Sequence, residues 1–265
     1  MSLYQAFLLG IVQGLTEFIP VSSTAHLLIS QSLLNIPTDD AMFSFLVIVQ
    51  LGTLVSLFAF YWRDLLSITR ATLNFRQSTP ERNLGFYLII ATIPALLAGY
   101  VLRDAVEELF KQPMLEASIR LFSAAILLTL AEWLTKKNRS LNSMTWLDAL
   151  VVGLFQIIAV FPGASRSGST ISGGMFRGFD RPSAARFAFL MSVPVMLAAG
   201  GYEMLDVIKM PNLGGFLPLL AVGFVTAAIV GWFAIKWLIG YLSKRSLYLF
   251  AAYCAVSGTL VFFLK

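Results

Sequence analysis

The sequence predicts an all-α polytopic membrane protein, with six transmembrane helices and two re-entrant helical hairpins arranged as an inverted-topology repeat. Its composition supports the membrane class, because the 265 residues are 58% hydrophobic and only 12% charged, whereas soluble domains are about a quarter charged. Several stretches approach the ~20 apolar residues that a helix needs to cross a bilayer. Polar clusters interrupt two other apolar stretches, which predicts the hairpins.

The chain is expected to form a single integral membrane domain over residues 1–265. No charged segment precedes the first apolar run, so we expect no cleaved signal peptide. The single cysteine, Cys254, excludes an intramolecular disulfide and a cysteine-cluster metal site. The net charge of +5 does not indicate a nucleic-acid partner, because the basic residues are spread among loops, where they act as topology signals.

Six segments have the length and apolar character of full spans: 41–61, 84–102, 119–135, 184–204, 217–239 and 247–264. Loops rich in Lys and Arg stay cytoplasmic, and three loops are basic: 62–83 with Arg63, Arg70, Arg76 and Arg82, 136–145 with Lys136, Lys137 and Arg139, and 240–246 with Lys244 and Arg245. Two acidic loops are expected outside: 103–118 with Asp104, Glu107, Glu108 and Glu116, and 203–216 with Glu203 and Asp206. This alternation places both termini outside.

Two apolar stretches remain, 1–34 and 146–183, and each is broken by a proline and a turn rich in Ser and Gly. If either were a full span, the orientation of the flanking spans would fail. Each is therefore predicted to be a re-entrant hairpin, with a half-helix on either side of a break at membrane depth. Irregular backbone is tolerated there only where it is buried in protein or lines a wet cavity.

The two halves of the chain, 1–137 and 138–265, each contain one hairpin followed by three spans. Because three is odd, the second half is inverted relative to the first. Short sequence echoes support the repeat: "GIVQ…FIPVSS" resembles "GLFQ…VFPGAS", and "IPALLAGY" resembles "VPVMLAAGGY". In such repeats the two breaks meet near the midplane, where binding sites are built.

The first half-helix carries an intramembrane carboxylate. Gln13 and Glu17 are four residues apart and share a helix face. An ionisable group inside a membrane is costly and is usually functional. Gly10 and Gly14 form a G-x-x-x-G pattern, which is equally typical of close helix packing.

The break that follows is predicted to end in a capped helix. Pro20 ends the first half-helix, and Ser22 or Ser23 caps the next one. If Ser23 is the cap, His26 takes the third helical position, within reach of the cap hydroxyl. A carboxylate, a hydroxyl and the only imidazole of the chain then converge at a helix N-terminus.

The second break reads "FPGASRSGST" and has the features of a phosphate cradle. Pro162 and Gly163 break the helix, and Arg166 offers a permanent planar cation that suits phosphate oxygens. The free N–H groups at the start of the next helix also favour an anion. The stretch matches neither a Walker loop nor a nucleophile elbow. Its hydroxyl groups belong to Ser165, Ser167, Ser169 and Thr170.

A carboxylate and an amide near a phosphate suggest a divalent cation that prefers oxygen, Mg²⁺ or Ca²⁺, held by Glu17 and Gln13. A cation that bridges phosphate oxygens beside a positioned hydroxyl suffices for phosphoryl transfer. A site embedded in lipid would suit a substrate with a polyprenyl tail.

These motifs resemble the bacterial undecaprenyl pyrophosphate phosphatase family of the bacitracin-resistance type. "QGLTEF" at 13–18 matches its (E/Q)-x-x-x-E motif, "PVSSTAH" at 20–26 its P-V-S-S-T-x-H, and "PGASRSGST" at 162–170 its P-G-x-S-R-S-x-x-T. The resemblance covers the whole chain. Members often have Glu at the position of Gln13, so the charge of the pair here rests on Glu17 alone.

The resemblance implies removal of the terminal phosphate of undecaprenyl pyrophosphate, which recycles the lipid carrier for cell-wall synthesis and confers bacitracin resistance. It also implies a divalent metal and a site that faces the outer side of the bacterial plasma membrane. Combined with the residue chemistry, it predicts catalytic roles for Glu17, Ser23, His26 and Arg166. His26 would act as base for Ser23 or as acid toward the leaving group. The phosphates would be held by Ser22, Ser165, Arg166, Ser167 and Thr170.

One alternative to this phosphatase family stays open at this point, and a second is set aside. Inverted repeats with broken helices are also transporter architecture, so the chain could flip polyprenyl phosphate, alone or in addition. The other lipid-phosphatase type needs two catalytic histidines, and this chain has one. The expected partners are the polyprenyl pyrophosphate and membrane lipids, with a homodimer as an open alternative.

Overall fold

The computed structural model describes residues 1–37, 39–74, 79–101, 113–159, 164–209 and 213–263. Within these ranges the regular structure is helical and contains no strand. The helices are α1 (Leu3–Thr16), α2 (Ser23–Leu33), α3 (Asp40–Leu73), α4 (Pro80–Val101), α6 (Pro113–Leu134), α7 (Trp146–Ile158), α8 (Arg166–Phe176), α9 (Arg181–Val207), α10 (Leu213–Leu242), α11 (Tyr248–Phe263) and the short 3₁₀ turn Leu141–Ser143.

Five helices, α3, α4, α6, α9 and α10, are long and apolar enough to cross a membrane. This confirms a multi-pass helical membrane protein. The predicted span 247–264 corresponds to α11, which has 16 residues and is shorter than the others. The prediction that α3 ends near residue 61 is wrong, because the helix bends at Tyr61 and continues to Leu73.

Arg63 and Arg70 therefore lie on a helix and not in a loop, while Arg76 lies outside the described residues. Residues 62–73 contain no Gly or Pro, so nothing in the sequence after the bend stops the helix before Leu73. The predicted acidic loop 203–216 also begins inside a helix, because α9 runs to Val207. Asp104, Glu107 and Glu108 lie outside the described residues.

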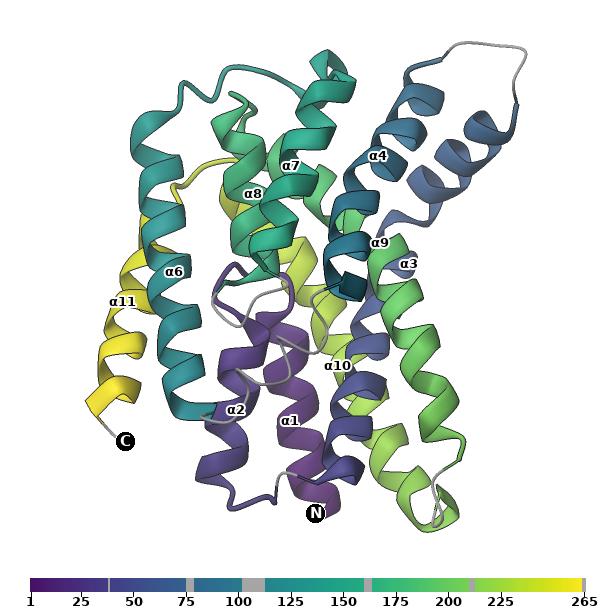
Figure 1. Ribbon diagram of the computed structural model, residues 1–265, viewed down its shortest axis with the longest axis vertical. Helices are drawn as coiled ribbons and strands as arrows, with labels where there is room; N and C mark the ends of the chain where they lie inside the picture. Colours follow the sequence, from purple (N-terminus) through teal and green to yellow (C-terminus); the bar gives the residue numbers. More distant parts are fainter. Residues whose placement is uncertain (38, 75–78, 102–112, 160–163, 210–212, 264–265) are drawn as a thin grey trace.

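Each of the two stretches 1–34 and 146–183 contains a pair of short helices separated by a break (Figure 1). We call α1 with α2 the first hairpin and α7 with α8 the second hairpin. The first hairpin enters from the end of the molecule where the N-terminus lies, and the second from the opposite end. The first break and the start of α8 meet near the middle of the molecule, so the chain brings its two polar motifs together.

The two hairpins begin and end in register. A constant offset of 143 residues takes Leu3 to Trp146 and Ser23 to Arg166, the first residues of the matching helices. Both α2 and α8 have 11 residues. Both α1 and α7 start with a capping box, formed by Ser2 with Gln5 and by Thr145 with Asp148.

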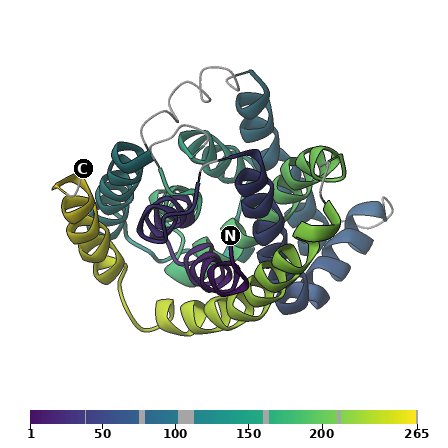
Figure 2. The ribbon, with the colours of Figure 1, turned by 90° about the horizontal axis from the view of Figure 1, so that it is seen from below.

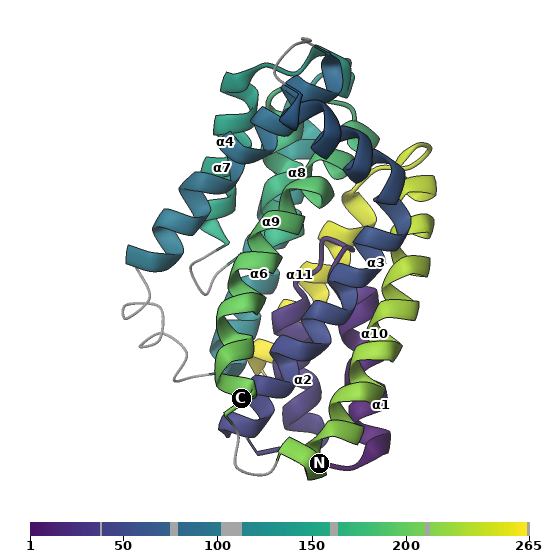
Figure 3. The ribbon, with the colours of Figure 1, turned by 90° about the vertical axis from the view of Figure 1, so that its right-hand side faces the viewer.

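The first hairpin lies among the longer helices (Figure 2), and α1 packs along α10, beside α3 (Figure 3). Glycine permits this approach, because a Cβ on Gly10 would lie 2.7 Å from the carbonyl oxygen of Gly223. In the same way, a Cβ on Gly153 of α7 would lie 2.5 Å from the carbonyl oxygen of Ala91 in α4. Each hairpin is therefore wedged against a helix from the other half of the chain.

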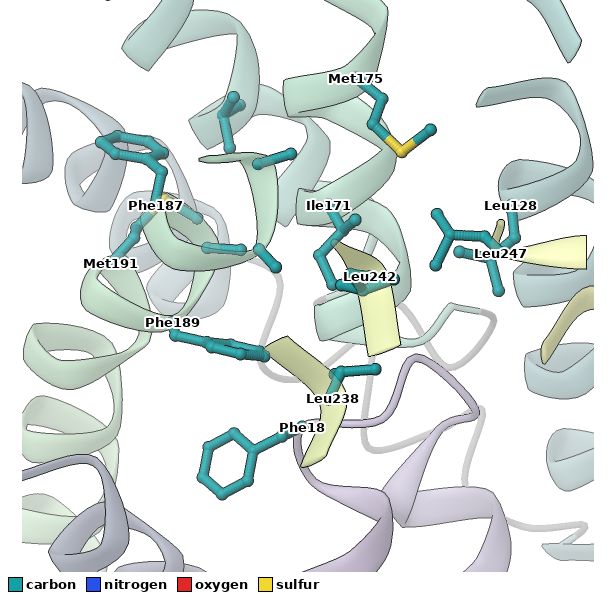
Figure 4. Close-up of a cluster of buried hydrophobic side chains, with 14 of the residues drawn as sticks. Phe18, Leu128, Ile171, Met175, Phe187, Phe189, Met191, Leu238, Leu242 and Leu247 are labelled. Carbon is teal, nitrogen blue, oxygen red and sulfur yellow. The ribbon is translucent and has the colours of Figure 1, made fainter. Parts of the chain in front are cut away.

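The main hydrophobic core anchors both breaks (Figure 4). Phe18, which follows Glu17, is 1% exposed and meets Phe189 of α9 edge to face, with 5.5 Å between ring centroids. Ile171 and Met175 of α8 are fully buried in the same cluster. Close packing of these side chains, which drives helix association in a membrane, fixes the backbone that presents the polar residues.

A buried carboxylate links the start of α7 to the end of α8, at the end of the second hairpin away from the break. Asp148 of α7 is fully buried and accepts hydrogen bonds from Arg139 (2.7 Å) and from Arg177, which follows α8 (2.6 Å). The hydrogen bond to Asp148 raises the pKa of Arg139 above its ordinary value. Asp148 thus joins the start of α7, the end of α8 and the linker between the two halves.

Replacing Asp148 with Asn should destabilise the protein, because two arginines would lose the carboxylate that compensates them. Each arginine side chain is about a third exposed, so we expect about 1–3 kcal/mol, less than for a fully buried pair. Thermal unfolding in detergent measures this change.

Asp64→Asn is the matched control, because the Asp64–Arg186 ion pair has a similar N–O distance of 2.8 Å but is exposed on both sides. We expect less than about 1 kcal/mol for the control. Equal losses in the two variants would contradict the structural role of Asp148.

Candidate active site

Glu17 lies at the centre of the contact between the two hairpins. Its side chain is buried, and its Oε2 accepts hydrogen bonds from Gln13 Nε2 (2.7 Å) and from Ser23 Oγ (2.9 Å). Its Oε1 forms an ion pair with Arg166 Nη2. The structure thus brings three other predicted site residues together around the carboxylate of Glu17.

Further contacts hold the start of α8 against the first break. Ser167 Oγ donates to the carbonyl oxygen of Ile19 (3.4 Å). A Cβ on Gly168 would lie 3.7 Å from the carbonyl oxygen of Pro20, so the start of α8 passes directly over the first break. Arg166 Nη2 also contacts Met196 Sδ of α9 at 3.4 Å. The guanidinium is therefore held between the first hairpin and α9.

Ser22, rather than Ser23, caps α2. Its Oγ accepts from the backbone N–H of Ala25 (3.4 Å), and its backbone has φ 69°, in the left-handed region that few side chains adopt. Ser23 is then the first helical residue, and its hydroxyl is free of the cap and points to Glu17. The sequence allowed either Ser22 or Ser23 as the cap, and the structure shows Ser22, whose backbone is strained.

The hydroxyl groups of the second break are arranged around the start of α8. Ser165 caps the helix by accepting from the backbone N–H of Gly168 (3.2 Å), and its Oγ lies 3.3 Å from that of Ser167. Thr170 donates to the carbonyl oxygen of Arg166 (2.8 Å). Ser169 is fully buried. Pro162 and Gly163, expected to break the helix, lie outside the described residues.

His26 contacts neither Ser23 nor Glu17 through any hydrogen bond between described residues. Its Nδ1 lies 2.8 Å from the carbonyl oxygen of Ser22, and its Nε2 lies 2.7 Å from the hydroxyl of Tyr253 in α11. The imidazole is therefore next to the cluster but faces the last helix. Sequence reasoning missed Tyr253, because a single tyrosine in an apolar helix resembles a lipid-facing aromatic residue.

A buried ion pair on α6 was also missed. Arg120 is 5% exposed, bonds Glu116 at 2.7 Å, and donates to the carbonyl oxygen of Ala164 (3.3 Å), next to the cap of α8. The prediction that Glu116 belongs to an outer loop is therefore wrong. Its spacing of four residues from Arg120, typical of a helical ion pair, was the signal that could have identified the pair.

The residues around Glu17 offer oxygen ligands but no dense metal cluster. Gln13 Oε1 is buried and has no hydrogen-bond partner among the described residues. The Glu17 carboxylate and the Ser23 hydroxyl are hard oxygen donors of the kind that Mg²⁺ and Ca²⁺ prefer. Gln13 would add a third if its amide turned so that Oε1, and not Nε2, faces Glu17. Among the described residues, no group of three or more His, Cys, Asp or Glu side chains could hold a metal ion. The donor set fits a cation whose coordination the substrate would complete.

A model of a known protein family matches nearly the whole chain. The model described as "Bacitracin resistance protein BacA" matches residues 6–260. The chain belongs to this family. The match to the BacA family confirms the resemblance that the three motifs indicated, and it covers the second hairpin and all but the first three residues of the first.

Curated relatives of similar length support the same family. A protein of Alkaliphilus metalliredigens is 39% identical over 98% of both chains. A protein of Chlorobium phaeobacteroides is 40% identical over 97% of this chain and 95% of its own. A protein of Mycobacterium marinum is 38% identical over 100% of this chain and 95% of its own. All three are named undecaprenyl-diphosphatase.

The left-handed backbone at Ser22 predicts an unusual order of stability. Ser22→Ala should lower the free energy of unfolding by about 0.5–2 kcal/mol, because it removes the cap and keeps the strain. Ser22→Gly should cost less or even stabilise, because glycine adopts positive φ without strain and still tolerates the cap position. Thermal unfolding of both variants in detergent checks the order, and a Gly variant less stable than the Ala variant would refute it.

Proposed function

We propose that this protein hydrolyses undecaprenyl pyrophosphate to undecaprenyl phosphate and inorganic phosphate, and so recycles the lipid carrier for peptidoglycan and other cell-wall polymers. Its relatives with this name match nearly the full chain, and the site contains the residue types that phosphoryl transfer needs. The observation that carries the proposal is the joint contact of Glu17 with Ser23 and Arg166. A hydroxyl, its proton acceptor and a phosphate-binding cation are thereby adjacent.

The pyrophosphate would bind at the start of α8. Arg166 supplies a planar fork for phosphate oxygens, and the free N–H groups and positive dipole end of α8 attract the same anion. Ser22, Ser165, Ser167 and Thr170 are proposed to line this anion site. A bound phosphate would compete with Glu17 for Arg166, which would release the carboxylate for chemistry.

Ser23 is proposed to attack the terminal phosphorus, or to orient a water that does. Its proton would pass to Glu17, whose Oε2 is 2.9 Å away. As the new bond from oxygen to phosphorus forms, the bond from phosphorus to the bridging oxygen breaks, and its electron pair leaves with undecaprenyl phosphate. If Ser23 is the nucleophile, a water then attacks the phosphoserine, which releases inorganic phosphate and restores the hydroxyl. If water attacks directly, inorganic phosphate forms in the first step. Because Ser23 bonds Glu17 and not His26, the role left for His26 is that of acid toward the leaving group, which requires that the neutral ring first take up a proton on Nε2. Quench-flow with labelled substrate separates the two routes, since only the covalent one places labelled phosphate on Ser23.

We propose that Glu17 and Gln13 hold a divalent metal ion, Mg²⁺ or Ca²⁺. Such an ion would supply charge neutralisation at the phosphate oxygens. The buried Gln13 Oε1 that lacks a protein partner supports this assignment.

We also propose that α11 is a sixth span and that residues 1–137 and 138–265 form an inverted repeat. The constant offset between the hairpins and the packing of each hairpin on the opposite half support this topology. α11 covers about 24 Å, somewhat less than a typical hydrocarbon core.

The family resemblance supports a location in the bacterial inner membrane with a site open to the outer side. A homodimer stays a prediction, and no observation favours the transporter alternative.

Phosphate release tests the function directly. The purified protein in detergent should release inorganic phosphate from undecaprenyl pyrophosphate, and Arg166→Lys should lower turnover at least about 100-fold, because a point charge cannot replace the planar fork. Arg186→Lys, at an exposed ion pair, is the control and should keep near-normal turnover. Wild-type protein that releases no phosphate would refute the function, and a near-normal Arg166→Lys variant would refute the anion site.

Gln13→Glu tests the metal assignment without relying on activity. A second carboxylate should lower the Mg²⁺ concentration that gives half the rise in unfolding temperature by about tenfold, since ligand charge sets affinity. Gln5→Glu, on the same helix but in its capping box, should leave this concentration unchanged. An unaltered concentration in the Gln13 variant, or an equal change in both, would contradict a metal at Gln13 and Glu17.

A further inference from the structure

Both ring nitrogens of His26 have a partner, and the partners define how the ring is protonated. Nδ1 lies 2.8 Å from the carbonyl oxygen of Ser22, which can only accept a hydrogen bond. Nδ1 therefore carries the proton, and Nε2 of the neutral ring keeps a lone pair. The hydroxyl of Tyr253, 2.7 Å from Nε2, then donates to it. Ser22, one turn before His26, and Tyr253, near the end of the chain, thus together select one tautomer of the ring.

Tyr253 also fixes the plane of the imidazole. The two rings are nearly parallel, with 11° between their planes and 5.7 Å between their centroids. Tyr253 belongs to α11, which packs along α6: a Cβ on Gly258 would lie 3.2 Å from Cβ of Leu121. The hydroxyl that meets His26 is therefore carried by a helix anchored on α6. The next residue, Cys254, also approaches the first break, with its Sγ 3.9 Å from the carbonyl oxygen of Pro20.

The opposite half of the chain makes an analogous contact. Arg120 of α6, the last helix of the first half, donates to the carbonyl oxygen of Ala164 beside the start of α8. Tyr253 of α11, the last helix of the second half, reaches His26 in the first turn of α2. The last helix of each half thus places one polar side chain at the hairpin of the other half, next to the start of that hairpin's second helix. The correspondence is one of helices and not of residues, because Tyr253 lies 133 positions after Arg120 and not 143.

We propose that Tyr253 is a positioning residue for His26. Its hydroxyl holds the neutral imidazole in the Nδ1–H form and fixes the ring beside the Glu17 cluster. The contact itself does not depend on the chemistry of the site, whereas its effect on turnover rests on the proposed phosphatase function. The two are therefore tested by separate measurements.

Nuclear magnetic resonance of the imidazole nitrogens tests the contact. The chain has only one histidine, so ¹⁵N-histidine labelling gives signals from His26 alone. The wild-type protein in detergent should show the Nδ1–H tautomer with a hydrogen-bonded Nε2. In Tyr253→Phe the Nε2 resonance should move to the position of a free lone pair, whereas Tyr248→Phe should leave it in place. Tyr248 is a matched control, because it lies on the same helix and is similarly exposed, 45% against 46% for Tyr253.

A wild-type spectrum of the Nε2–H tautomer, or an Nε2 resonance that is unchanged in Tyr253→Phe, would overturn the proposal. Turnover provides the second measurement. Tyr253→Phe should lower kcat about threefold to tenfold, the effect of one hydrogen bond, while KM changes less than about twofold and the unfolding temperature stays near that of Tyr248→Phe. If the wild-type protein released no phosphate, the proposed function would fail, while the resonance experiment would still decide the role of Tyr253.

Discussion

A carboxylate buried within a membrane protein needs a compensating charge, and the ion pair between Glu17 and Arg166 meets that need across the two hairpins. An isolated ionised side chain at this depth would cost several kcal/mol. Because the two partners lie 149 positions apart in the chain, neither hairpin can compensate its own charge. The packing that brings the breaks together is therefore a condition for burying either residue.

The same constraint explains why the site is suited to phosphate chemistry. An arginine that pairs with a carboxylate can exchange that partner for a phosphate group, because both are oxyanions that suit its planar fork. The proposed metal ion would then compensate the charge of Glu17. The exchange would leave Glu17 bonded to Gln13 and Ser23, ready to accept a proton. Ground-state compensation and proposed catalysis thus use the same atoms, so the residues that hold the hairpins together are also those that would act on the substrate.

The local features were predictable from sequence because they depend on short-range physics. Pro20 and the serines after it fix the first break. The G-x-x-x-G pattern at Gly10 indicates close helix packing, and the short distance from Gly10 to Gly223 confirms it. Long-range pairing was not predictable: the choice of Glu17 as the partner of Arg166, and of Tyr253 as the partner of His26, depends on how distant helices pack. His26 was expected near Ser23, but the carbonyl of Ser22 one turn earlier captures its Nδ1. Glu116 was placed in a loop because its charge outweighed its helical pairing with Arg120.

A double-mutant cycle on Glu17 and Arg166 tests the central claim most directly. The free energy of unfolding would be measured in detergent for Glu17→Gln, Arg166→Gln and the double variant. If the ion pair joins the hairpins, each single variant leaves a buried charge uncompensated, and the double variant should be more stable than the sum of the single losses by about 1–3 kcal/mol. Strictly additive losses would show that the two charges do not interact, and would contradict the account.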